Sequence, residues 1–152
     1  MVPTTRARSF RRKPGEEGEE EARPTSGALL SSLPAWQREW AQRLGREADD
    51  LGARSQVQRS RGSVEWELCW LLDRRPVMTL RLTPQGVRVL LAVPERAAEL
   101  WLQGPSDDEE LRRDLLRALP RRGLRRVEVG LGSAVRARAV ADLLRLVARV
   151  GT

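Results

Sequence analysis

The chain has 152 residues, of which 40% are hydrophobic and 32% charged, and 28 basic against 21 acidic residues give it a net charge of +7. It has no run approaching the roughly 18 apolar residues that a membrane-spanning helix needs, so we expect one soluble domain with no membrane partner. Histidine and tyrosine are absent, and Cys69 is the single cysteine. This composition excludes an internal disulfide and removes the commonest general base and most zinc-site chemistry.

The first 27 residues differ in composition from the rest of the chain. They hold a basic block from Arg6 to Lys13, an acidic block from Glu16 to Glu21 and three prolines, with little to bury. Such a segment does not offset the entropy cost of its own ordering. The sequence therefore predicts a disordered charged tail over 1–27 and a single domain over 28–152. No apolar stretch before Leu29 resembles a signal-peptide core, which favours the cytoplasm.

A helix with one buried face is predicted from about residue 33 to 51. Ser32 is its expected cap and Pro34 falls in its first turn. The apolar residues at helical spacing, which we expect to face the core, are Leu33, Trp36, Trp40, Leu44 and Leu51. The polar stretch that follows, ARSQVQRSRGS, predicts a loop or a weak edge strand around Gln56 to Arg59.

Three strands follow, separated by two turns. Apolar and polar residues alternate in VEWELCWLL, which begins at Val64, and again in VMTLRLT and VRVLLAV. A period of two is typical of a strand with one face on a core. The turns Asp73 to Pro76 and Pro84 to Gly86 connect these strands, so the sequence predicts a three-stranded antiparallel meander.

The second turn also predicts the register of the meander. Every apolar side chain lies on one face if the pairs are Leu82 with Val87, Leu80 with Val89 and Met78 with Leu91. This register sets Arg81 opposite Arg88 on the other face, where two like charges are unfavourable. A three-residue first turn would bring Glu67 beside Arg81. Glu67, Arg81 and Arg88 are therefore a candidate anion site, although a solvated charge patch is the favoured interpretation.

One end of that polar face is expected to be apolar. Leu90 falls opposite Thr79, and Ala92, Cys69 and Leu71 lie nearby. A contiguous apolar patch on an open sheet face usually marks a contact. We expect either that the tail or the loop over residues 52–63 folds over it, or that two copies meet there in a weak homodimer with two-fold symmetry.

The last third of the chain predicts two helices, a fourth strand and a final helix. One helix follows Pro94 and ends near Gly104. The next is capped by the acidic run from Ser106 to Glu109 and continues to about Leu119, with Leu111, Leu115, Leu116 and Leu119 as its apolar residues. Those acids match the positive end of the helix, so we expect no metal site there.

RRVEVGL predicts the fourth strand, and Ser133 is expected to cap the final helix. The stripe of this helix contains Val140, Leu143, Leu144, Val147 and Val150. The fold class is thus α+β, a two-layer arrangement in which an antiparallel three-strand meander and a fourth strand carry helices on one face.

The order of these elements is similar to that of two small bacterial groups. The strand VEWELCWLL, the strand ending LTP, the strand VRVLLAV leading into PER, and the helix AVADLLRLV together resemble the YdhG-like and YjbR-like domains of unknown function. The resemblance covers about residues 33 to 150. It implies DNA binding on the YjbR-like side and an iron-chaperone role for some YdhG-like members, and it carries over no individual functional residue. The first helix lacks the acidic ridge that the iron role would need.

The residues themselves favour a non-catalytic binding or protein-interaction module over an enzyme. We expect this module to use no cofactor. No phosphate-binding loop follows the glycines, although the helix start at Ser133 offers free N–H groups to an anion. The alternative is a nucleic-acid-binding protein. Its candidate contacts are arginines in two clusters, namely Arg121, Arg122, Arg125 and Arg126, and Arg136 and Arg138. A coding sequence rich in G and C would produce the same arginine excess without any function, and both interpretations stay open.

Overall fold

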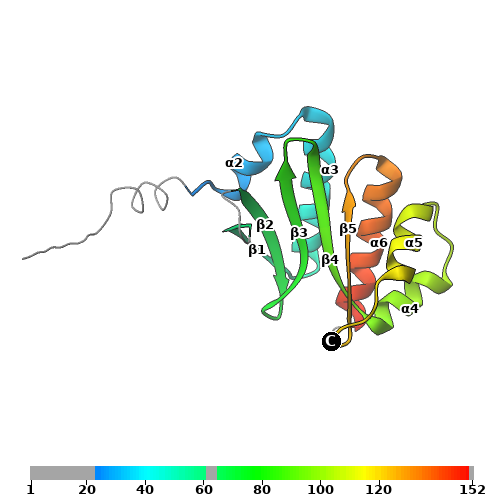
Figure 1. Ribbon diagram of the computed structural model, residues 1–152. Helices are drawn as coiled ribbons and strands as arrows, with labels where there is room; N and C mark the ends of the chain where they lie inside the picture. The colour runs from blue at the N-terminus through cyan, green and yellow to red at the C-terminus, as the bar shows by residue number, and fades with distance from the viewer. Residues whose placement is uncertain (1–22, 61–64, 151–152) are drawn as a thin grey trace, which may run out of the picture.

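The structure is a computed structural model that describes residues 23–60 and 65–150 (Figure 1). The helices are α2 (Ser26–Ser31), α3 (Ala35–Asp50), α4 (Glu95–Gln103), α5 (Glu109–Arg117) and α6 (Ala134–Val150). The strands are β1 (Arg54–Arg59), β2 (Trp66–Leu72), β3 (Arg75–Thr83), β4 (Gly86–Pro94) and β5 (Leu124–Gly130). Val64 and residues 1–22 of the predicted tail lie outside the described residues.

The strands form one antiparallel sheet in the order β1-β2-β3-β4-β5. Helices α3 and α6 pack against each other on one face of it, and α4 and α5 lie beyond the edge strand β5 (Figure 1). The predicted α+β, two-layer class is confirmed. The sheet has five strands and not the four that were predicted, because the segment predicted as a loop or weak edge strand forms β1. The expected fourth strand is therefore the fifth.

The predicted register of the meander is confirmed pair by pair. Leu82 faces Val87, and Arg81 faces both Arg88 on β4 and Glu67 on β2. The first turn differs in detail, because Leu72 pairs with Arg75 across a turn of two residues with positive φ, Asp73 and Arg74. A bulge between the pairs of Trp70 and Leu71 supplies the extra residue that a three-residue turn would have given.

The inner face of the sheet and the two long helices enclose the core. Leu68, Leu80 and Val89 of the sheet are fully buried, as are Leu44 of α3 and Leu143 of α6. Each such side chain contributes about 1.5–3 kcal/mol by leaving water. Polar residues alternate with these along the strands, so they occupy the opposite surface, which we call the outer face.

Two helix starts differ from the expectation. Ser32 does not cap α3. It ends the unpredicted helix α2, where its hydroxyl donates to the carbonyl oxygen of Leu29 at 2.6 Å, and Pro34 precedes α3 without a side-chain cap. Helix α5 is capped by Asp108, whose carboxylate accepts the N–H of Leu111 at 3.0 Å. Ser106, the first residue of the expected cap, instead accepts the N–H of Asp108.

Two predicted apolar stripes were wrong in part. On α3 the buried residues are Gln37, Ala41, Leu44, Gly45 and Ala48, and Trp36 is 54% exposed. The helix is rotated because small residues let it approach the sheet closely: a side-chain carbon on Gly45 would lie 2.9 Å from the Trp70 ring. On α5, Leu111 and Leu115 are buried whereas Leu116 is exposed, and Leu119 is exposed beyond the end of the helix at Arg117.

Candidate functional site on the outer face of the sheet

The outer face brings the three predicted site residues together. Arg81 Nε lies 3.3 Å from Glu67 Oε2, and Arg81 and Arg88 face each other across β3 and β4. A fourth residue, Glu128 of β5, completes the group. Its carboxylate lies 3.1 Å from Arg88 Nε and 3.8 Å from Arg81 Nη1. We call these four residues the charged row.

Glu128 is the member of the charged row that the sequence did not identify. It was recognised as a residue of the last strand, but α4 and α5 separate that strand from β4, so no turn fixed its register. In the structure Glu128 pairs with Leu90, one diagonal position from Arg88. The like charges of Arg81 and Arg88 are unfavourable across the ladder. An acidic side chain lies on each side of the pair, Glu67 beside Arg81 and Glu128 beside Arg88.

Glu67 is held firmly despite its outward position. It is 5% exposed and accepts hydrogen bonds from Gln58 Nε2 at 2.8 Å and Ser60 Oγ at 2.9 Å, in addition to Arg81. Buried carboxylates need such donors to offset their desolvation. Strand β1, the edge-strand alternative of the sequence prediction, therefore completes this half of the charged row.

The charges of the row balance. Two guanidinium groups face two carboxylates, so no positive charge is left over to attract an anion. This balance favours the interpretation of the row as an ion-pair network, in which the exposed pair of Arg88 and Glu128 contributes modestly to stability.

Cys69 also lies on the outer face, between Gln56 and Thr79 on the neighbouring strands. It is buried, and burial raises the pKa of its thiol above the ordinary value, with the nearby Glu67 carboxylate adding to the effect and a hydrogen bond with Thr79 opposing it. A raised pKa leaves less of the nucleophilic thiolate at neutral pH. The arrangement therefore favours a packing role for Cys69.

An apolar hollow occupies the other end of the outer face, as the register predicted. Its volume is about 370 Å³, and its lining runs over Pro76–Thr79 of β3, Leu90–Ala92 of β4 and Arg126–Glu128 of β5. Leu90 and Ala92 are half-buried and project into it between Thr79 and the edge strand. No helix of the described chain covers this face (Figure 1).

The arginines of the nucleic-acid alternative do not gather on one surface. Those from Arg121 to Arg126 lie around the start of β5, whereas Arg136 and Arg138 lie beyond its other end, in the first turns of α6. Arg125 forms an ion pair with Glu95 at 2.7 Å and donates to the Leu115 carbonyl oxygen at 3.0 Å. Arg121, Arg122, Arg126 and Arg138 are exposed.

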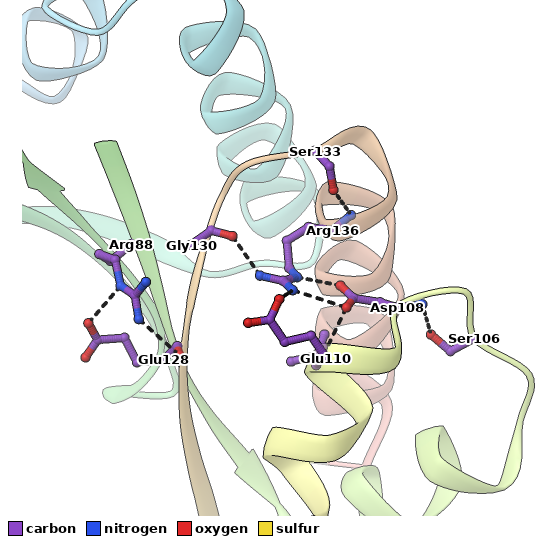
Figure 2. A network of polar contacts seen from close by, with 9 residues as sticks. Arg88, Ser106, Asp108, Glu110, Glu128, Gly130, Ser133 and Arg136 are labelled. Atoms are coloured by element: carbon purple, nitrogen blue, oxygen red, sulfur yellow. Dashed lines mark hydrogen bonds and ion pairs between the residues drawn. The ribbon is translucent and has the colours of Figure 1, made fainter. Parts of the chain in front are cut away.

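Arg136, a candidate nucleic-acid contact, is buried (Figure 2). Its guanidinium donates to both carboxylate oxygens of Asp108, to Glu110 Oε1 at 2.8 Å and to the Gly130 carbonyl oxygen at 2.8 Å. Burial by itself lowers the pKa of Arg136, but the hydrogen bonds with the two carboxylates outweigh it and raise that pKa. Ser133 caps α6 as predicted, accepting the N–H of Arg136 at 3.1 Å.

Within residues 23–60 and 65–150, no group of three or more acidic or cysteine side chains is arranged to hold a metal ion. None of the helices in these ranges is long and apolar enough to cross a membrane. Comparison of the chain with protein-family models, curated proteins and solved structures finds no match.

Proposed function

We propose that this protein is a non-catalytic interaction module that forms a weak homodimer through the outer face of its sheet. The observation that carries the proposal is the apolar hollow around Leu90 and Ala92, which is open on a sheet face that no described helix covers. Exposed apolar surface of this kind is costly in water and usually marks a contact. The composition supports a non-catalytic role, because a chain without histidine or tyrosine has few acid-base groups near neutral pH.

A second copy of the chain suits this surface because the rim of the hollow is self-complementary. In a two-fold interface, residue i of one copy contacts residue j of the other, and j contacts i. Arg126 and Glu128 border the hollow with opposite charges, and both are exposed. Arg126 forms no ion pair with any described residue, and the Glu128 carboxylate of a partner, although it contacts its own Arg81 and Arg88, is 41% exposed and can accept Arg126 as well.

The size of the outer face sets the strength of the contact. Strands about 4.8 Å apart and about six residues long give a face on the order of 20 Å by 20 Å, or about 400 Å² per copy. Specific complexes of standard size bury about 800 Å² per partner. The homodimer is therefore weak and depends on protein concentration.

Sedimentation velocity from about 1 µM to about 1 mM, a range that covers weak affinities, tests the proposal. The wild type is expected to shift from monomer to dimer across this range. Leu90→Glu places a carboxylate in the hollow and should abolish the dimer without lowering the melting temperature. If Leu90→Glu unfolds the chain, Ala92→Glu at the edge of the same hollow replaces it.

Leu119→Glu is the matched control, because Leu119 is 82% exposed and lies outside the hollow. It should leave the dimer unchanged. A wild-type chain that stays monomeric at the highest concentration would contradict the proposal. The nucleic-acid alternative requires binding to duplex DNA that weakens with salt, with a log-log slope of about −0.9 per phosphate neutralised.

A further inference from the structure

A polar cleft of about 480 Å³ lies at the end of the sheet where β5 leads into α6, away from the apolar hollow. The turn between β3 and β4, the first turn of α3 and the start of α6 form its walls. Its lining includes Trp36, Gln37, Arg88, Glu110 and Arg136, together with the backbone from Gly130 to Ser133. A cleft of this volume is within the range of small-molecule sites.

Gln37 is the unusual residue of the cleft. It is 4% exposed, yet its side-chain amide forms no hydrogen bond with any described residue. The amide lies against Gly86, where a side-chain carbon would come within 2.5 Å of Nε2. Among the described residues, Arg38 Nε is the one buried side-chain nitrogen or oxygen without a partner, so the Gln37 amide atoms reach the open space of the cleft. An amide that lines a cleft without a partner offers an adjacent donor and acceptor to a ligand.

Both arginines that line the cleft already have carboxylate partners. Arg88 bonds Glu128 through Nε and Nη2, to a side-chain oxygen and the carbonyl oxygen respectively (Figure 2). Arg136 is paired with Asp108 and Glu110. Among the described residues that line the space, each guanidinium has a carboxylate partner, and Asp108 and Glu110 together exceed the single positive charge of Arg136. The cleft therefore disfavours an anionic ligand.

Two further features favour a flat ligand with acceptor atoms. Trp36 is a large exposed side chain on the rim, 54% accessible, and an indole ring offers a stacking surface. The first-turn N–H groups of Ala134 and Val135, beside Ser133, have no partner within α6, and both residues are exposed. A side-chain carbon on Gly132 would meet no atom within 4 Å, so access to this backbone is open.

We propose that this cleft binds an uncharged planar molecule with an amide-like edge, the chemistry of a nucleobase or nucleoside. Gln37 pairs with the donor and acceptor on the edge of the base, and Trp36 stacks on its face. Enzymes that take a base out of a duplex recognise it by these two kinds of contact. This cleft is separate from the apolar hollow, so a test of nucleoside binding is independent of a test of the homodimer.

Titration of the full chain with adenosine, guanosine, cytidine and uridine, followed by ¹H–¹⁵N NMR, tests the proposal. At least one nucleoside should shift the indole N–H signal of Trp36, assigned with Trp36→Phe, and the side-chain amide signal of Gln37. Ribose alone should shift neither signal. The absence of shifts with all four nucleosides at millimolar concentration would overturn the proposal. Adenosine monophosphate that binds more than about tenfold tighter than adenosine would also overturn it, because that result would identify an anion site.

Gln37→Met keeps the length of the side chain but removes its hydrogen-bonding edge. It should weaken nucleoside binding about tenfold or more and leave the melting temperature close to that of the wild type, because the amide forms no hydrogen bond with a described residue. A purely structural Gln37 would instead give a lower melting temperature. Trp36→Ala, at an exposed position, should weaken binding without unfolding the chain. Gln42→Met is the matched control, because Gln42 lies on the same helix but outside the cleft. Nucleoside binding that is retained in Gln37→Met would overturn the proposal.

Discussion

The guanidinium of Arg136, in the first turn of α6, donates to both carboxylate oxygens of Asp108, the residue that caps α5. The same guanidinium bonds the carbonyl oxygen of Gly130, at the end of β5. One buried side chain therefore fixes the starts of two helices to the end of a strand. This contact also forms one wall of the polar cleft.

Arg136→Met should lower the free energy of unfolding by about 3–5 kcal/mol, because it leaves the buried Asp108 carboxylate without its charged partner. Urea denaturation measures the change. Arg138→Met, at an exposed position two residues further along α6, should stay within about 0.5 kcal/mol of the wild type. Adding Asp108→Asn to Arg136→Met should recover part of the loss, since a neutral amide no longer leaves a charge unpaired. Equal losses in the Arg136 and Arg138 variants would contradict the role of the pair.

Gly86→Ala should destabilise the turn between β3 and β4 by about 1–3 kcal/mol. Gly86 has a φ of +126°, which side-chain-bearing residues rarely adopt, and the added carbon would lie 2.5 Å from Gln37 Nε2. Thermal or urea unfolding measures the loss. Gly132→Ala, where the added carbon meets open space, is the control and should be nearly neutral. Combining Gly86→Ala with Gln37→Ala should relieve the contact but not the backbone strain, so the two changes should not be additive.

The ion pair between Glu95 and Arg125 should make stability depend on pH in the acid range. The Arg125 hydrogen bond lowers the pKa of Glu95 below its ordinary value. A carboxylate with a lowered folded-state pKa stabilises the fold above its unfolded pKa, and loses this contribution as the pH falls through the folded pKa. Glu95→Gln should therefore destabilise the protein near neutral pH, and the difference from wild type should shrink below about pH 4.3.

Urea midpoints measured between about pH 3 and pH 7, a range that spans the ordinary carboxylate pKa values, test this prediction. Glu99→Gln on the same helix is the control, because Glu99 lies 3.9 Å from Arg96 at an exposed position. A difference between Glu95→Gln and wild type that does not change with pH would contradict the assignment.

Cys69 should react slowly with a disulfide reagent in the folded protein. Burial raises the pKa of its thiol and blocks access to the sulfur. The pH-rate profile should have its midpoint above the ordinary thiol pKa, and unfolding in urea should speed the reaction. Cys69 is the single cysteine, so the reaction that is measured comes from this residue alone. Glu67→Gln should move the midpoint down, because it removes a nearby negative charge; a fast reaction in the native protein would contradict the burial.

The sequence by itself determined the elements that depend on local patterns. Alternation placed β2 to β4, and the short turn at Pro84 and Gln85 fixed their register, because a slip of one residue would have moved every apolar side chain to the wrong face. The pairing of Arg81 with Arg88 and Glu67 followed from this register. The same reasoning predicted the apolar end of the outer face.

Only the tertiary structure decided which residues meet across long separations in the chain. Glu128 joined the charged row because β5 pairs with β4 after an excursion through two helices, and no local signal carries that register. Rotation of α3 exposed Trp36 and buried Gln37, since contact with Trp70 requires the small Gly45 and overrides the hydrophobic stripe. Arg136 was buried because Asp108, 28 positions earlier, caps a neighbouring helix. Packing of distant elements thus formed the cleft and placed the Gln37 amide in its wall.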